Sequence, residues 1–105
     1  MKTIYFVRWI VKEGNEEKAK ELLKANFDHI SNTEQGNVIF ITHQSVENPR
    51  EFWMYEVWEN QEAVDKHENS RWFREGYKEV LRPIVEPDSV TFGNVKVLQA
   101  RGVTL

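Results

Sequence analysis

The residue best suited to acid-base chemistry in this chain is His67. An imidazole can take up or release a proton near neutral pH. Ala63, Val64 and His67 recur at the three- and four-residue spacing that forms one face of a helix, so His67 should face inward. Two interpretations stay open: His67 is a catalytic base, or it is a half-buried histidine bonded to a backbone carbonyl.

The second candidate for chemistry is Glu56, which lies in the otherwise apolar segment 52–58. It alternates with Tyr55, so the two side chains point to opposite faces of a sheet, and it shares its phase with Met54 and Trp58. A buried carboxylate must be paired or protonated. Glu56 therefore has two possible environments. In the favoured one it accepts a hydrogen bond from a donor such as an arginine or His67. In the other it borders a cavity where a substrate supplies the donor.

Aromatic side chains near these two residues offer flat surfaces to a ligand. Small-molecule pockets are mostly apolar, but aromatic residues at helical spacing usually belong to the core, so only some should touch a ligand. The substrate-binding candidates are Tyr55, Trp58, Trp72, Phe73 and Tyr77, with His43 as a secondary candidate. Three arginines could hold an anionic or phenolate oxygen: Arg8, Arg71 and Arg74.

No residue pattern predicts a metal or phosphate site. The chain has no cysteine, and its histidines, at positions 29, 43 and 67, lie on different predicted elements without ligand spacing. There is no glycine-rich phosphate loop, no dinucleotide fingerprint and no Ser-His-Asp arrangement. His29 lies off the centre of its helix's apolar stripe, and we interpret it as a surface or helix-end histidine.

The composition predicts one domain spanning residues 1–105. Charged residues make up 30%, and the net charge is −3 with acids and bases interleaved, so no basic stripe predicts nucleic-acid binding. The absence of cysteine suits a reducing cytoplasm. Arg8 interrupts the N-terminal apolar run, which we interpret as a strand rather than a signal peptide. No segment approaches the roughly 20 apolar residues of a membrane span, so we expect a cytoplasmic protein without a membrane partner.

Four segments have the pattern of strands: 3–11, 38–45, 52–58 and 90–100. The second and third are joined by a short polar turn around Asn48-Pro49, which predicts an antiparallel hairpin. Gly93 is a candidate bulge in the last strand.

Helices should occupy the intervening segments. Asn15 is the expected cap of the first helix, with Asn60 and Ser70 capping two shorter ones and Pro83 ending the last. The apolar stripe of the first helix comprises Ala19, Leu22, Leu23, Phe27 and Ile30. The stripe of the last helix comprises Trp72, Phe73, Gly76, Tyr77, Val80 and Leu81.

This order of elements predicts an α+β fold, a ferredoxin-like antiparallel sheet with helices on one face. The first and third strands carry large apolar residues in both alternation phases, as in the runs 4–10 and 52–58. The face without helices should then be an interface. Two sheets closing across a two-fold axis would form a homodimer with the shape of a dimeric α/β barrel.

The run Tyr55-Glu56-Val57-Trp58-Glu59, followed by Glu62-Ala63, His67, Ser70 and Trp72-Phe73, resembles the signature of the antibiotic biosynthesis monooxygenase domain. The Gly14 turn, the long first helix, Gly36 and the Asn48-Pro49 turn also match, so the resemblance covers nearly the whole chain. The family consists of small dimeric α/β barrels. It includes cofactor-independent monooxygenases of polycyclic aromatics, quinol monooxygenases, a haem-degrading subgroup and a relative that processes a phosphorylated signalling molecule.

The haem-degrading subgroup depends on an asparagine in the first strand, a tryptophan on the second helix and a histidine on the third. Val7, His67 and Tyr77 stand at these positions here. Without the haem-ligating histidine, the resemblance disfavours haem degradation, and we expect no cofactor.

The resemblance implies a cofactor-independent monooxygenase that oxidises a quinol-like or polyphenolic aromatic substrate with molecular oxygen. In this reading His67 takes the substrate proton, Glu56 biases the imidazole, and the aromatic residues orient the ring. Two alternatives remain. One is an isomerase or processing enzyme for a small oxygenated metabolite, including a phosphorylated one. The other is a ligand-binding dimer without turnover.

Overall fold

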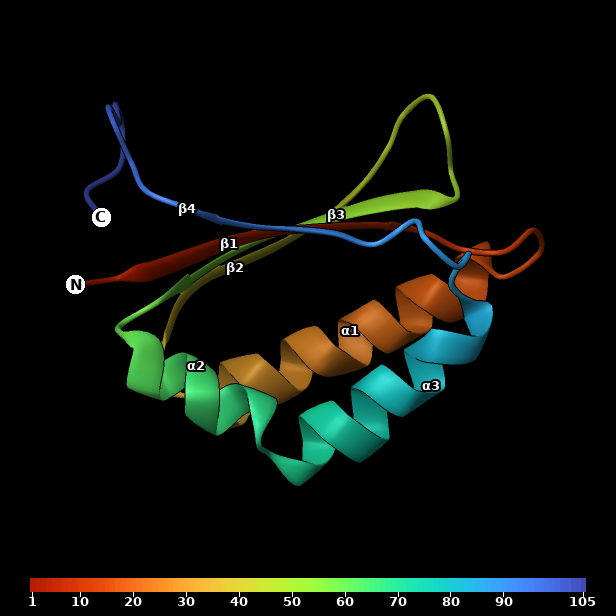
Figure 1. Cartoon of the computed structure of the whole chain (residues 1–105), viewed down its shortest axis with the longest axis horizontal. Coiled ribbons are helices and arrows are strands. Elements are labelled where there is room, and N and C mark those ends of the chain that lie inside the picture. The colour runs from red at the N-terminus through yellow and green to blue at the C-terminus, as the bar shows by residue number, and fades with distance from the viewer.

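Four antiparallel strands form one sheet, and helices cover only one of its faces (Figure 1). The computed structural model describes residues 1–105. The strands are β1 (Thr3–Ile10), β2 (Asn37–Gln44), β3 (Glu51–Trp58) and β4 (Thr91–Val95), in the sheet order β2-β3-β1-β4. The longer helices are α1 (Glu16–Thr33) and α2 (Gln61–Glu68). This arrangement confirms the predicted α+β ferredoxin-like fold and the antiparallel hairpin of β2 and β3.

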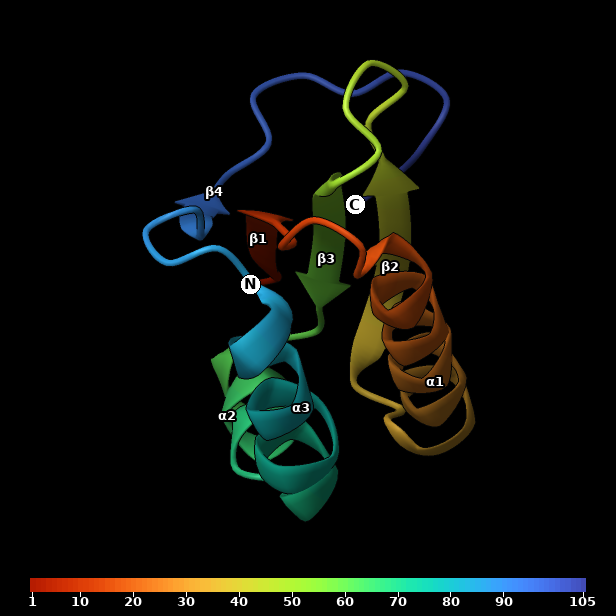
Figure 2. The same ribbon diagram turned by 90° about the vertical axis from the view of Figure 1, so that its right-hand side faces the viewer.

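The helices form two groups beneath the sheet. Figure 2 shows α1 under the β2 side, with α2 and the following helical segment under the side of β1 and β4. None of the helices is long and apolar enough to cross a membrane.

The central strands β1 and β3 place different side chains on the two faces of the sheet, because successive side chains alternate. The helix face carries the register pairs Tyr5↔Glu56, Val7↔Met54 and Trp9↔Phe52. The opposite face carries Phe6↔Tyr55 and Arg8↔Trp53. No helix covers this second face, and Phe6 and Trp53 are 44% and 41% exposed there.

The core lies between the helix face of the sheet and the helices, and α1 supplies the largest share of its helical residues. Ala19, Leu22, Leu23 and Ile30 are buried, as the stripe predicts. Phe27 is not, because it lies at the flank of α1 and packs against Phe40 near the open edge of the sheet. The polar Asn26 is buried instead.

The two predicted asparagine caps have different outcomes. The Asn60 side chain accepts a hydrogen bond from the Ala63 backbone at 2.9 Å, which confirms it as the cap of α2. Asn15 occupies the predicted N-cap position of α1, but its side chain makes no capping bond, and its amide donates instead to the carbonyls of Lys12 and Glu13. Its backbone carbonyl still accepts from Ala19 and begins α1.

The segment after α2 is not one regular α-helix. It is a π-helical stretch, η1 (Trp72–Lys78), followed by a short α3 (Glu79–Leu81) and a 3-10 turn, η2 (Arg82–Ile84). Ser70 Oγ accepts from the Phe73 backbone at 3.1 Å, so the predicted cap is present. The wider π turn directs Trp72, Phe73 and Tyr77 toward the interior and leaves Val80 exposed.

The last strand is shorter than predicted, 91–95 rather than 90–100. Its final pair is Ile4↔Val95, and β1 begins at Thr3, so β1 offers almost no further backbone for pairing. Gly93 pairs with Phe6 in regular register and is not a bulge. The irregularity of the sheet lies in β2, between Asn37 and Ile39.

Gly76 allows the Trp72 ring to pack across the π turn, because a Cβ there would lie 2.4 Å from Trp72 Cε3. An alanine in a helix normally stabilises it relative to glycine. We predict the opposite sign for Gly76→Ala, a loss of about 1–3 kcal/mol in the free energy of unfolding from overpacking, measured by denaturant titration. Gly93→Ala is the matched control, since the nearest atom to its Cβ is 3.9 Å away. A stabilised Gly76→Ala would contradict the packing argument.

Candidate functional site

A cavity of about 450 Å³ lies between the helix face of the sheet and the segments that follow β3. Its wall is largely apolar, with Val7, Met54 and Phe92 from the sheet and Phe73 and Tyr77 from η1. Glu56 and His67 also line it, so the structure brings the two predicted catalytic residues to one cavity. Exposed charged residues border it: Glu68, Lys78, Arg82 and Asp88.

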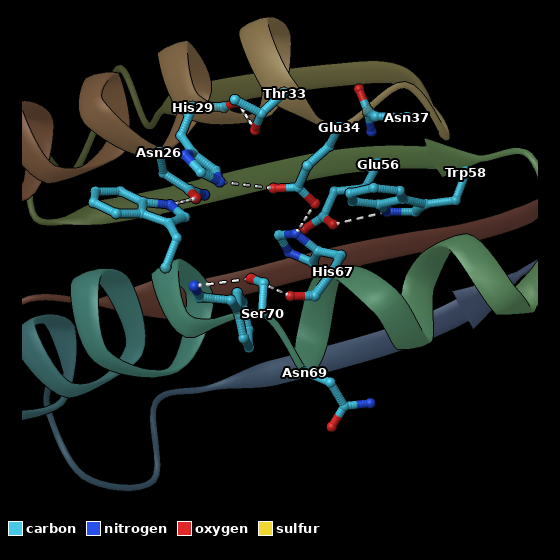
Figure 3. Close-up of polar contacts among 12 residues, drawn as sticks. Asn26, His29, Thr33, Glu34, Asn37, Glu56, Trp58, His67, Asn69 and Ser70 are labelled. Carbon is cyan, nitrogen blue, oxygen red and sulfur yellow. Dashed lines mark hydrogen bonds and ion pairs between the residues drawn. The ribbon is translucent and has the colours of Figure 1, made fainter.

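His67 is buried, with 5% of its surface exposed, and its ring is held from three sides. Its Nδ1 lies 2.6 Å from Glu34 Oε1 (Figure 3). The rings of Trp58 and Phe73 each lie 4.6 Å from the imidazole, measured between centroids. In the neutral imidazole the carboxylate fixes Nδ1 as the donor, and Nε2, which makes no hydrogen bond within the protein, then carries the lone pair.

Glu34 follows the last residue of α1, where its backbone N–H donates to the Ile30 carbonyl. One carboxylate oxygen bonds His67, and the other is buried without a hydrogen-bond partner. That second oxygen faces His29 Nε2 at 3.6 Å. Glu34 is the residue that the sequence argument missed, because it lies beyond the apolar stripe and 33 positions from His67.

Glu56 accepts a hydrogen bond from the Trp58 indole at 3.1 Å, not from an arginine or His67. Burial raises its pKa above the ordinary value of 4.5, and the nearby Glu68 and Glu34 add to this effect. The Trp58 bond opposes the rise in pKa, and His67 opposes it too when its imidazole is protonated. Glu56 thus offers the cavity a carboxyl that holds a proton more readily than usual.

The predicted aromatic candidates separate into two groups. Phe73 and Tyr77 line the cavity. Trp58 is fully buried beneath His67, and Trp72 stacks on His29 while donating to Asn26 Oδ1 at 2.9 Å, so both lie behind the wall.

Tyr55 and His43 lie on the opposite face of the sheet. Tyr55 packs on Phe6 with centroids 4.8 Å apart, and His43 Nδ1 lies 3.2 Å from the Trp53 carbonyl. Neither side chain lines the cavity within one copy of the chain.

The three candidate arginines also lie away from the cavity. Arg8 pairs with Glu51 and lies over the Trp53 ring on the opposite face. Arg71 pairs with Glu75, and Arg74 donates to the Asn69 carbonyl. The arginine that does border the cavity is Arg82.

Two other lining residues could have been found from sequence spacing. Tyr5 shares its phase with Val7 and Trp9, which face the helices. Asn26 lies four residues after Leu22 and four before Ile30, a polar residue within an apolar stripe. A buried amide at such a position indicates a specific bond partner, here Trp72.

His29 is not the surface histidine that its position predicted. It is half-buried, its ring stacks on Trp72 with centroids 5.0 Å apart, and it faces Glu34. The end of α1 packs against η1, which explains why an off-stripe residue is covered.

The side chain at the position of the haem-degrading subgroup's iron ligand does not suit that role. Tyr77, at the position of the subgroup's histidine ligand, lines the cavity together with Val7 and His67. Burial, and to a lesser degree Glu56, raise the Tyr77 pKa well above its ordinary value of 10. A neutral phenol is a poor iron ligand compared with an imidazole or a tyrosinate. No group of three or more histidine, aspartate or glutamate side chains is placed to hold a metal ion.

A family model described as antibiotic biosynthesis monooxygenase matches residues 4–79. The chain belongs to this family. No curated protein matches the chain.

Solved structures share the fold of this family member. A candidate antibiotic biosynthesis monooxygenase from Bacteroides thetaiotaomicron has a TM-score of 0.86 at 18% identity, covering 99% of this chain and 95% of that one. A second candidate from Nitrosomonas europaea has a TM-score of 0.82 at 21% identity, covering 96% and 94%. A candidate monooxygenase from Lactobacillus acidophilus has a TM-score of 0.81 at 25% identity, covering 89% of this chain and 43% of that one. Family membership supports a monooxygenase-like role in general terms.

Because folding raises the pKa of Glu56, this residue should lower the free energy of unfolding by an amount that depends on the pH. Above pH 4.5 the folded protein binds more protons at this site than the unfolded chain, so stability falls as the pH rises through the folded pKa. Glu56→Gln removes the charge and can keep the Trp58 bond. We expect it to raise the melting temperature by a few degrees at about pH 7, with a smaller gain at about pH 4.

Exposed Glu59→Gln is the control and should show little change at either pH. An equal effect of Glu56→Gln at both pH values would contradict the assignment.

Proposed function

We propose that the protein is a cofactor-independent monooxygenase acting on a quinol-like or polyphenolic aromatic substrate. The observation that carries the proposal is a buried imidazole whose Nδ1 is held by Glu34 and whose Nε2 is free at the wall of an apolar cavity. The cavity volume of about 450 Å³ lies within the range of small-molecule sites.

The chemistry requires a proton acceptor and a site with little water. His67 Nε2 takes the proton of a substrate hydroxyl, which leaves an electron-rich phenolate. The phenolate supplies the electrons that reduce dioxygen; one oxygen atom enters the substrate and the other leaves as water. Phe73 and Tyr77 pack against the aromatic ring, and Glu56 in its protonated form donates a hydrogen bond to the developing oxyanion.

The alternatives fit the cavity less well. A phosphorylated metabolite would meet Lys78 and Arg82, but Glu68, Glu86 and Asp88 line the same opening and would repel it. A purely structural dimer would fill its interior with its own side chains, whereas this cavity is open. A ligand-binding dimer without turnover would use the same cavity and differs by showing no oxygen consumption. A non-phosphorylated oxygenated metabolite remains as the second candidate, because the same acid-base pair would serve an isomerase.

The proposal includes a homodimer formed through the sheet face without helices. This face exposes the apolar side chains Phe6, Ile41, Trp53, Val95, Val97 and Leu98. Burying such a patch against a second copy would remove it from water. A two-fold axis allows the same surface to serve both partners.

His67→Ala should lower turnover by about 10²–10⁴-fold because the general base is lost, while the protein stays folded but is less stable because Glu34 loses its partner. The assay is oxygen consumption with a panel of dihydroxy-aromatics in the presence of a metal chelator. Lys66→Ala, a neighbouring exposed position on α2, is the control and should keep full activity. Equal turnover by His67→Ala and the parent would make His67 a structural residue.

Ile41→Glu should convert a dimer to a monomer in sedimentation velocity at micromolar concentration, because it buries a charge in the interface. Val80→Glu is the matched control: Val80 is 40% exposed against 45% for Ile41, but it lies on the helix side. A folded monomeric parent protein would refute the proposed dimer.

A further inference from the structure

Three titratable side chains form a line from the cavity to the surface of α1. His67 borders the cavity and contacts Glu34 Oε1 through Nδ1 at 2.6 Å. Glu34 Oε2 lies 3.6 Å from His29 Nε2, and the His29 side chain is 31% exposed. Figure 3 shows Glu34 between the two imidazoles, with dashed contacts to both.

Packing alone does not explain two features of the row formed by His67, Glu34 and His29. Glu34 Oε2 is buried without a hydrogen-bond donor, which costs free energy in a structural carboxylate. In its present position His29 does not donate a hydrogen bond to Glu34 Oε2. Its ring stacks on Trp72, and the Trp72 indole donates to Asn26. A small movement of either side chain would close the 3.6 Å separation to a hydrogen bond once Glu34 carries a proton.

We propose that His29, Glu34 and His67 form a proton relay between the cavity and bulk water. The inference rests on the proposed function, since it gives a path to the proton that His67 removes from a substrate. Without such a path the proton would stay on the imidazole beside the phenolate and would readily return to it.

The transfers balance at each atom. His67 Nε2 accepts the substrate proton while Nδ1 releases its own to Glu34 Oε1, so the imidazole stays neutral. A half turn about the Glu34 Cγ–Cδ bond exchanges the two oxygens and presents the proton to His29 Nε2. His29 then releases a proton from Nδ1 to water. When reduced oxygen leaves as water, protons return along the same path in the opposite direction.

Other charged groups near His67 do not provide this path. Glu56 on β3 accepts from Trp58 and lies inside the cavity, on the substrate side of the imidazole. Glu68 on α2 also lines the cavity. Glu34 is the group that contacts both histidines; His29 lies in the last turns of α1 and Glu34 directly follows that helix.

The test measures exchange of the His67 Nδ1 proton with water by NMR on substrate-free protein. The relay predicts that the Nδ1 proton exchanges faster than burial alone allows. In His29→Phe the exchange rate should fall several-fold, because phenylalanine keeps the stack on Trp72 but cannot carry a proton. The exchange rate of the Val64 backbone amide in α2 serves as a reference that corrects for any change in local unfolding of this helix. Glu34→Gln should slow the exchange as well, because an amide does not relay a proton.

An unchanged rate of Nδ1 exchange in His29→Phe would overturn the relay. This holds even if Glu34→Gln slows the exchange. If His29→Phe fails to fold, His29→Gln gives the same comparison. Because no substrate is present, a positive result stands even if the oxygen-consumption panel fails. A negative one leaves the monooxygenase proposal intact.

Discussion

The hydrogen bond between His67 and Glu34 joins the last turn of α2 to the residue after α1, across 33 positions of sequence. Both partners are shielded from water, so losing either one would leave the other without compensation. The bond also decides which imidazole nitrogen carries the proton. Nδ1 is committed to the carboxylate, and the cavity therefore meets a basic Nε2 between the rings of Trp58 and Phe73.

The cavity depends on close packing around it. Gly76 admits the Trp72 ring to the π turn, and the Trp72 indole bonds Asn26 on α1. This contact connects η1 to α1 and directs Phe73 and Tyr77 toward the space below the sheet. A π-helical segment at this place fits the tendency of such segments to occur at functional sites, since its wider turn aims neighbouring side chains at the cavity.

Sequence periodicity was sufficient for the fold and for part of the site. Alternation placed Glu56 and Tyr55 on opposite faces, and helical spacing placed His67 inward, because both depend on local geometry alone. Glu34 and His29 could not be found in this way. Their roles depend on how the end of α1 packs against α2 and η1, a long-range contact that no local pattern encodes. The π turn was missed because the predicted stripe assumed the period of an α-helix, and the wider turn moves Val80 out of that stripe.

The central claim is that His67 presents an unprotonated Nε2 to the cavity. The most direct test is the ¹⁵N chemical shift of both ring nitrogens in histidine-labelled protein, at a pH where the imidazole is neutral. We expect a protonated, pyrrole-type Nδ1 and a pyridine-type Nε2, with the pattern lost or mixed in Glu34→Ala. A protonated Nε2 in the parent protein would contradict the assignment, because the cavity would then face a donor and not a base.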